Sequence, residues 1–122
     1  ATLTYWSLEA GLLAGKVNLE RAFEKNDFRN HAAQWHPWYK KENIERLLDV
    51  FVKWSDILNR HECTLSQLVI AWTAAQPGAS HVLCGAKTAA QSEQNADAGS
   101  IVLKPDEIDR IRDDLNALGD PI

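Results

Sequence analysis

The 122-residue chain contains no apolar run that approaches the roughly 20 residues needed by a membrane-spanning helix. Its first residues, ATLTYWSLEAG, lack the basic start and apolar centre of a secretory signal peptide, so we expect a cytoplasmic protein. An excess of positive charge is also lacking: the formal net charge is -4, which argues against a broad nucleic-acid-binding surface. We therefore expect neither a membrane nor a nucleic acid among its partners.

Cysteine is scarce and histidine is scattered, which argues against a metal site. Cys63 and Cys84 form no CxxC pair, and without an export signal we expect two free thiols in a reducing compartment. Cys84 stands beside a glycine and is either a reactive thiol or a buried thiol at a strand end. The four histidines have no metal-ligand spacing with one another or with cysteine, so no metal cofactor is predicted.

The composition that remains is that of an ordinary globular domain, with 45% apolar and 25% charged residues. A chain of this length has room for one domain with a modest core. No repeat of fixed period and no low-complexity segment divides it. Residues 1–122 are therefore treated as a single segment.

Two short strands are predicted, one near each end of the chain. The first covers Leu3 to Trp6, because Thr, Tyr and Trp favour extended structure; with the glycine-containing loop after it, it occupies residues 1–16. The second covers His81 to Cys84, whose continuous apolar run is typical of a strand covered on both faces. Residues 17–40 show no clean period and are expected to form a long loop of the kind that usually has a function.

Helical spacing dominates the remainder. Residues 41–76 are predicted to form two helices, the first running to about Arg60 and the second beginning with a capping box of Thr64 and Gln67. Residues 80–98 contain the second strand and a helix that starts at Thr88, with a further capping-box candidate there. The last helix covers residues 104–119.

This order of elements predicts an α/β fold with parallel strands. Two strands alone make a poor sheet, because both would present unpaired edges. The pattern therefore indicates part of a larger sheet or barrel.

The turn between the second strand and its helix, Gly85 to Lys87, has the composition of an anion site. Free amide groups and the dipole at a helix start bind anions, glycine permits a close approach, and lysine adds a positive charge. Side-chain amides follow on one face of the helix and suit the edge of an adenine ring. These amides belong to Gln91, Gln94 and Asn95. On spacing alone, the alternative is an ordinary strand–turn–helix with solvated side chains.

The stretch GAKTAAQSEQN resembles the cofactor-binding segment of the aldo-keto reductases, which holds the adenosine 2′-phosphate of NADP and the adenine edge. The resemblance implies that Lys87 faces the 2′-phosphate. Lysine in place of the commoner arginine leaves a point charge without the planar fork, and NADP(H) remains the expected cofactor. The residues implied to line the phosphate are Gly85, Ala86 and Thr88, and those implied to face the adenosine are Gln91, Gln94 and Asn95.

The stretch YWSLEAGLLAGK resembles the seventh barrel strand of that family and the loop after it. Tyr5 then matches the tyrosine that stacks on the nicotinamide, although Trp6-Ser7 replaces the commoner Ser-Pro. The residues implied to wrap the pyrophosphate are Leu8, Gly11, Leu12, Gly15 and Lys16. With DFR, ENIERL and TLSQLVIAWTAAQPG also similar to the family, the resemblance covers essentially the whole chain in order.

The resemblance implies the C-terminal part of a (β/α)8 TIM barrel, namely its last two β/α units and the C-terminal helix. It further implies a C-terminal fragment of an NADP(H)-dependent aldo-keto reductase, an oxidoreductase that reduces aldehydes or ketones by hydride transfer. The family's catalytic Asp, Tyr, Lys and His lie on earlier strands and have no counterpart here, so the chain alone is expected to be inactive. Its partner would be the N-terminal portion of the barrel.

Two alternatives from other classes stay open. One is a non-catalytic nucleotide-binding or self-associating half-barrel module, which would use the exposed strand edges. The other is an unrelated small helical protein.

Four tryptophans and two pairs of acids have expected positions in the fold. Trp54 and Trp72 lie on apolar helix faces and are expected in the core. Trp35 and Trp38 lie in the long loop and are either pocket wall or local anchors. The acid pairs expected on a solvated helix face are Asp106-Glu107 and Asp113-Asp114.

Overall fold

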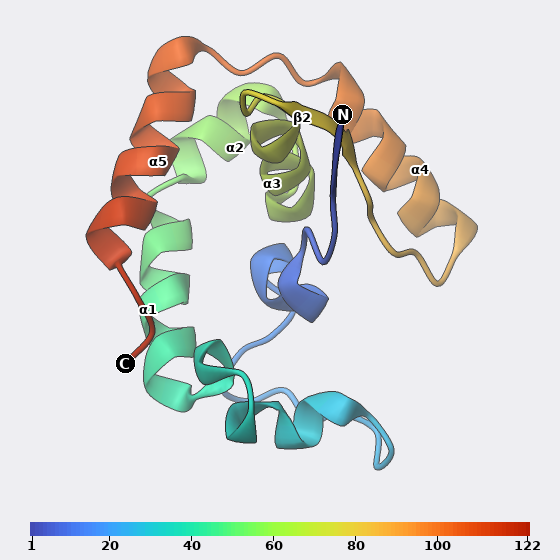
Figure 1. The fold of residues 1–122 in the computed structure, drawn as a ribbon, viewed down its shortest axis with the longest axis vertical. Helices are drawn as coiled ribbons and strands as arrows, with labels where there is room; N and C mark the ends of the chain where they lie inside the picture. Colours follow the sequence, from blue (N-terminus) through green and yellow to red (C-terminus); the bar gives the residue numbers. More distant parts are fainter.

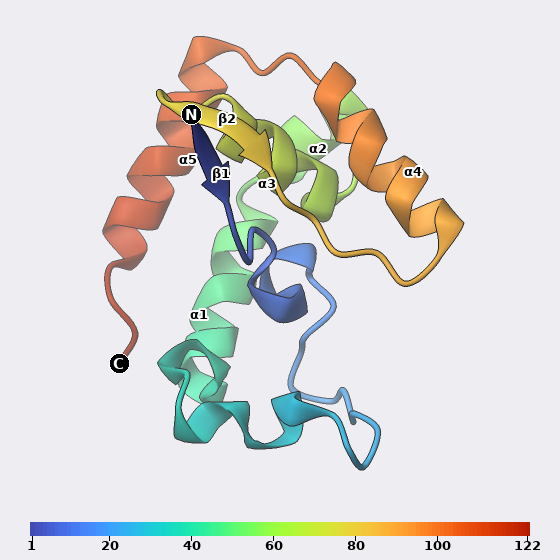
Figure 2. The ribbon, with the colours of Figure 1, turned by 45° about the vertical axis from the view of Figure 1, so that its right-hand side comes forward.

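The computed structural model describes all of residues 1–122 as a mixed α/β structure, mostly helical, with one small parallel sheet. Helices lie behind and to either side of the two strands in Figure 2, and the segment between the first strand and the first long helix extends away from them (Figures 1 and 2). In chain order the elements are β1 Thr2–Thr4, η1 Glu9–Ala14, η2 Phe28–Gln34, η3 Pro37–Tyr39, α1 Lys41–Val52, α2 Ser55–His61, α3 Leu65–Ala74, β2 Ala79–Val82, α4 Ala89–Asp97, η4 Ala98–Ser100 and α5 Pro105–Leu118, where η denotes a 3-10 helix.

β1 and β2 pair in parallel although they lie near opposite ends of the chain. Thr2 is opposite Ala79 and Leu3 is opposite His81, with an irregularity between the first two residues of β1. Both arrows point the same way in Figure 2, so the loops that follow the two strands leave from one edge. This shared edge positions the candidate site.

β1 is shorter than its sequence predicts, and β2 is displaced toward the N-terminus and more exposed than predicted. β1 stops at Thr4, since Trp6 has a φ of 58°, which a strand cannot accommodate. β2 starts and ends earlier than predicted, and Ser80 and His81 are exposed. The prediction that this strand is covered on both faces is therefore wrong for this chain, because the sheet has two strands and α3 is the helix that packs on it.

The hydrophobic core lies between the helices rather than on the sheet. Part of α5 packs against α1 (Figure 1), and the buried faces of α1, α2 and α3 contribute to the same core. Trp54, Ile57 and Leu68 are almost completely buried, and Trp72 packs half-buried against them. The core role predicted for both tryptophans is confirmed. The capping box of Thr64 and Gln67 is also present.

The single helix predicted to run to about Arg60 is two helices, with a break at Lys53 and Trp54. Trp54 has φ -95° and ψ 7°, outside the helical range, so α2 starts afresh at Ser55. The break carries the indole into the core, where its N–H donates to Asp114 at 2.8 Å. Asp114 therefore has a structural partner and is not simply part of a solvated face.

Glu107 is a second acid that the sequence predicts to be solvated and that the structure buries. Its side chain is 2% exposed and accepts from the N–H of Lys104 at 2.9 Å and from His61 Nε2 at 2.8 Å, and it pairs with Arg60. Burial acts to raise the pKa of Glu107, but these hydrogen bonds outweigh it and hold the pKa below its ordinary value. The carboxylate thereby joins the start of α5 to the end of α2.

The segment predicted as a structureless loop, residues 17–40, consists largely of short 3-10 turns. η2 is capped by Asp27, and η3 starts at Pro37. Tyr39, at the end of η3, is buried beneath the first loop of the chain. The segment therefore has a defined structure and packs against the loop that follows β1.

Candidate functional site

The loops that follow the two strands leave the sheet side by side. β1 ends at Thr4 and β2 at Val82, and the N–H of Leu83 donates to the carbonyl of Thr4 at 3.1 Å. At the carboxyl edge of parallel strands, loops from neighbouring strands converge, and ligands bind there. The fold thus brings together the two segments, starting at Tyr5 and at Gly85, that the sequence predicts to hold a cofactor.

The first loop, residues 5–16, has a backbone that most residues adopt poorly. Glu9 and Ala10 have φ values of 45° and 51°, and Gly11 has 102°. Left-handed conformations of non-glycine residues cost about 1–3 kcal/mol each and cluster at functional sites. Gly15 is also left-handed, at 66°, and a Cβ there would lie 3.2 Å from a leucine side chain. Both glycines of the loop are thus required by its shape.

The side chains predicted to bind the cofactor in this loop differ in their exposure to solvent. Tyr5 is 80% exposed, so its ring can stack on a planar group. Leu12 is 3% exposed and belongs to the core, so only its main chain can contact a ligand. The other predicted positions, half-buried or exposed, are Leu8, Gly11, Gly15 and Lys16.

The second loop, between β2 and α4, is held by side chains of the helix that follows it. The N–H of Lys87 donates to Gln91 Oε1 at 2.7 Å, and Asn95 Nδ2 donates to the carbonyl of Gly85 at 3.3 Å. Thr88 caps α4 by accepting from the N–H of Gln91 at 3.2 Å. The capping box predicted at Thr88 is half formed, because the Gln91 side chain bonds Lys87 instead.

The start of α4 fits an anionic group. The first N–H groups of a helix have no intrahelical acceptor, and the dipole there favours negative charge. Lys87 is exposed at this position, and Ala86 and Gly85 beside it are also exposed, with no atom near enough to obstruct an approach to the glycine. Of the three predicted amides, Gln91 and Asn95 already bond the loop main chain, whereas the Gln94 side chain makes no such bond.

Within the segment between residues 17 and 40, Asp27 and Arg29 form a close ion pair. The Asp27 carboxylate accepts from the N–H of Arg29 at 2.9 Å and pairs with its guanidinium at 2.5 Å. These hydrogen bonds hold the pKa of Asp27 well below its usual range, and the charge of Lys87 acts in the same direction. The Asp27 carboxylate is therefore ionised and paired with Arg29.

Aromatic rings from three segments gather beside Tyr5. Trp6 stacks on Tyr5 with ring centroids 6.2 Å apart and lies nearly parallel to His36 at 6.3 Å. Trp35 joins this group and is 53% exposed, whereas Trp38 packs half-buried against the core. The two tryptophans of the long loop thus differ in surroundings. The cluster consists of Tyr5, Trp6, Phe28, Trp35, His36 and Tyr39.

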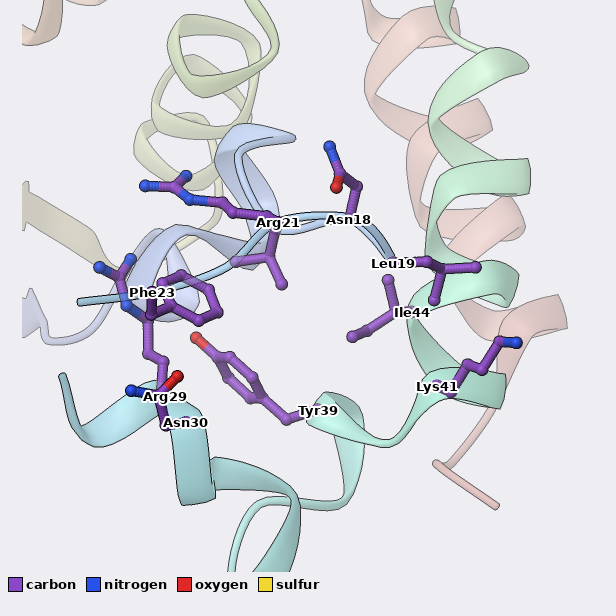
Figure 3. A pocket seen from close by; sticks show the side chains of 10 residues that line it. Asn18, Leu19, Arg21, Phe23, Arg29, Asn30, Tyr39, Lys41 and Ile44 are labelled. Carbon is purple, nitrogen blue, oxygen red and sulfur yellow. The ribbon is translucent and has the colours of Figure 1, made fainter. Parts of the chain in front are cut away.

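A pocket of about 380 Å³ lies under the segment that follows the first loop (Figure 3). Its three basic side chains do not converge on the cavity. Arg29 pairs with Asp27, and Arg21 donates to the carbonyl of Lys16. The amine of Lys41 points away from the other lining side chains in Figure 3. The basic side chains of the pocket therefore do not meet around one position for an anion, and we do not assign the cofactor to it.

Sequence reasoning missed the residues that hold the first loop. Glu9 Oε2 lies 2.9 Å from His36 Nε2, and the Tyr39 hydroxyl donates to the main chain of the same loop. The available signal was the concentration of aromatic and histidine residues in WHPWY. Their pairing with a loop 27 or more residues earlier is not encoded in any local spacing.

Comparison with known proteins decides the family. A sequence model of the Aldo/keto reductase family matches residues 1–115. The chain belongs to the aldo/keto reductase family. The resemblance drawn from its motifs is thereby confirmed, and the alternative of an unrelated small helical protein is excluded.

Similar members of the family come from a fungus and two bacteria. The chain is 33% identical over 90% of its length to Aldo-keto reductase str7 of Strobilurus tenacellus, covering 32% of that protein. It is 28% identical over 93% of its length to the NADH-specific methylglyoxal reductase of Escherichia coli (strain K12), covering 33% of it. It is 32% identical over 99% of its length to Aldo-keto reductase YhdN of Bacillus subtilis (strain 168), covering 36% of that protein. The chain spans about a third of the length of these relatives.

The remaining features of this aldo/keto reductase chain concern its thiols, metal ligands and helix hydropathy. Cys63 and Cys84 are free and half-buried, and burial raises the pKa of both thiols. No three His, Cys, Asp or Glu side chains gather closely enough to hold a metal ion. None of the helices combines the length and apolarity needed to cross a membrane.

Proposed function

We propose that this chain supplies the cofactor-binding part of an NADP(H)-dependent aldo-keto reductase that reduces aldehydes or ketones. The observation that carries the proposal is the juxtaposition at one sheet edge of two loops. One is the left-handed glycine loop after β1, and the other is the Lys87 turn in front of α4. A dinucleotide needs both a phosphate site and a planar contact within one span, and the exposed Lys87 and Tyr5 at this edge support the proposal.

Each part of the edge has a distinct proposed role. Lys87 and the first N–H groups of α4 would bind the adenosine 2′-phosphate, and Gln94 would face the adenine. The main chain of the first loop would follow the pyrophosphate, and the exposed ring of Tyr5 would lie against the nicotinamide. When bound, the nicotinamide supplies the hydride that reduces the carbonyl group. The chain's own contribution is to fix the position of that donor relative to the substrate.

The catalytic groups are proposed to come from the remainder of the barrel. Both strands have a free outer edge and exposed residues, which supports pairing with further strands. The chain also covers only about a third of its relatives. Its partner is therefore proposed to be the missing barrel portion, and the 122-residue chain alone is expected not to reduce carbonyl compounds.

Titration calorimetry with NADPH and NADH on the 122-residue chain tests the cofactor assignment. Lys87→Ala should weaken NADPH by about 10-fold, the value of one lost charge-assisted contact, and NADH by less than about 2-fold. Lys53→Ala, which removes an exposed lysine distant in sequence from both loops, is the matched control. Equal losses for the two nucleotides would remove Lys87 from the 2′-phosphate site, and the NADH-specific relative makes that outcome informative.

A complementation assay tests the reaction itself. The chain is mixed with a separately produced N-terminal portion of a related reductase, and oxidation of NADPH is followed with an aldehyde. Activity in the mixture and in neither part supports the proposed division. Stable self-assembly seen by native mass spectrometry, without complementation, would favour the self-associating module instead.

A further inference from the structure

We propose that Tyr39 and His36 are positioning residues that hold the first loop in its cofactor-binding shape. The inference rests on the proposed function, because it concerns the loop that we propose follows the pyrophosphate. It goes beyond that function by assigning a role to two residues that need not touch the cofactor themselves.

The loop needs to be held because its backbone is unfavourable. Glu9, Ala10 and Gly11 are consecutive and all left-handed, with φ values of 45°, 51° and 102°. Two of these residues carry a Cβ, which makes such conformations uncommon. A conformation of this kind persists only when the surrounding structure determines it. The contacts around these residues therefore decide whether the loop keeps its shape.

Tyr39 holds the main chain at the left-handed residues. Its hydroxyl donates to the carbonyl of Glu9 at 3.3 Å and to that of Ala10 at 3.2 Å, so one hydrogen is shared between two acceptors. The residue is 7% exposed, and burial raises the pKa of its hydroxyl, which keeps it protonated as a donor near neutral pH. In a trans peptide the N–H points opposite to the carbonyl. The hydroxyl therefore helps to fix the peptide between Glu9 and Ala10, and with it the direction of the Ala10 N–H. At the next peptide the Ala10 carbonyl also accepts from Arg29 at 3.3 Å, and the N–H of Gly11 donates to the carbonyl of Leu8 at 2.9 Å.

His36 holds the side chain of Glu9, the first of the three consecutive left-handed residues. Its Nε2 lies 2.9 Å from Glu9 Oε2. The ring contacts two aromatic side chains: Trp6, whose plane is only 8° from its own, and Tyr39, whose ring centroid lies 5.3 Å away in an edge arrangement. Glu9 is consequently fixed at both its carbonyl and its carboxylate by residues about 30 positions later in the chain.

Hydrogen exchange measured by NMR on the 122-residue chain tests the inference without requiring a ligand. Tyr39→Phe removes the hydroxyl and keeps the ring. We expect the amides of Gly11 and Gly15, which bond within the loop, to exchange about 5- to 10-fold faster, since one hydrogen bond is lost, while amides of α3 are unchanged. Thr73→Val is the matched control, because it removes a half-buried hydroxyl that bonds a main-chain carbonyl at 2.7 Å in α3.

Affinity for NADPH is then measured on the same variants. Tyr39→Phe should weaken NADPH by about 3- to 10-fold and Thr73→Val should leave it unchanged. His36→Ala should weaken it too, whereas His36→Gln should restore binding, because a glutamine amide can still donate to Glu9. This rescue separates positioning from packing, which both replacements disturb.

The outcomes separate this inference from the proposed function. If the unaltered chain fails to bind NADPH, the proposed function loses its support, and the positioning role is judged on exchange alone. If Tyr39→Phe leaves exchange in the loop equal to that of the control, the positioning role is overturned, even where NADPH binds.

Discussion

Replacing Glu107 by glutamine tests whether a buried carboxylate joins α5 to α2. The change keeps the shape of the side chain and removes its charge. Glu107 faces three donors, namely the N–H of Lys104, His61 Nε2 and the Arg60 guanidinium. Glutamine can accept with one oxygen only, and its NH2 group must then face one of these donors.

The expected loss of stability follows from these contacts. Hydrogen bonds to a charged group contribute about 1.5–3 kcal/mol each, and neutral ones about 0.5–1.5 kcal/mol. Two weakened bonds and one unsatisfied donor sum to about 2–4 kcal/mol. Arg60 is 45% exposed, so water compensates part of its loss. We therefore expect the free energy of unfolding to fall by about 2–3 kcal/mol, with a decrease of Tm on the order of 10 °C.

The dependence of this loss on pH provides a second check. The pKa of Glu107 is lower in the folded chain than its ordinary value of 4.5. Its contribution to stability is therefore complete above about pH 4.5 and is lost as pH falls through the folded-state pKa. The difference between the original chain and Glu107→Gln should be smaller at pH 3.5 than at pH 5.

Urea unfolding followed by circular dichroism measures both effects. Asp106→Asn is the control, since this acid precedes Glu107 on the same first turn but is exposed and makes no side-chain hydrogen bond. Its change should stay within about 0.5 kcal/mol, the size of a helix-dipole effect. A loss at Glu107 no larger than at Asp106, or one that persists unchanged at pH 3.5, would refute the reasoning.

Three further predictions concern single sites. Asn43 is fully buried and bonds the carbonyls of Pro37 and Ile122 at 2.8 and 3.1 Å, so Asn43→Ala should reduce the urea-derived free energy of unfolding by about 2–3 kcal/mol; a loss under about 1 kcal/mol would show that these bonds contribute little. Thr64→Ala should cost about 1 kcal/mol by removing the cap of α3, and Thr64→Ser should retain most of it; equal losses would exclude the cap as the cause. Because burial raises the pKa of both half-buried thiols, iodoacetamide at pH 7.5 should alkylate the folded chain several-fold more slowly than the urea-unfolded chain, and equal rates would contradict that effect.

Local signals in the sequence predict most of the helix starts and the turn in front of α4. The capping box at Thr64 and the proline at the start of α5 mark helix starts that the structure reproduces. The turn before Thr88 is also where the sequence predicts it, because glycine and a capping residue act on their immediate neighbours. Each of these features depends on residues within one helical turn.

Features that depend on distant partners escaped prediction. No proline or glycine in the sequence predicts the break before α2. The break is explained by the burial of Trp54 and by its hydrogen bond to Asp114, 60 residues later. Glu107 belongs to a first turn where acids are ordinarily solvated, and it is buried where α5 meets Arg60 and His61 of α2. Likewise, the contact of Tyr39 with Glu9 results from the fold and not from a spacing.

The pairing of β1 with β2 has a consequence for the order in which the chain folds. The N–H of Thr2 bonds the side chain of Ser80, 78 residues away, whereas the helices between them form from neighbours. Closing so long a loop loses much chain entropy before any contact compensates, and such pairings form slowly. The edge that is proposed to bind the dinucleotide should thus assemble last. A ligand that spans both loops would favour this closure and slow its reversal, so that cofactor availability becomes a determinant of how long the chain persists in its native form.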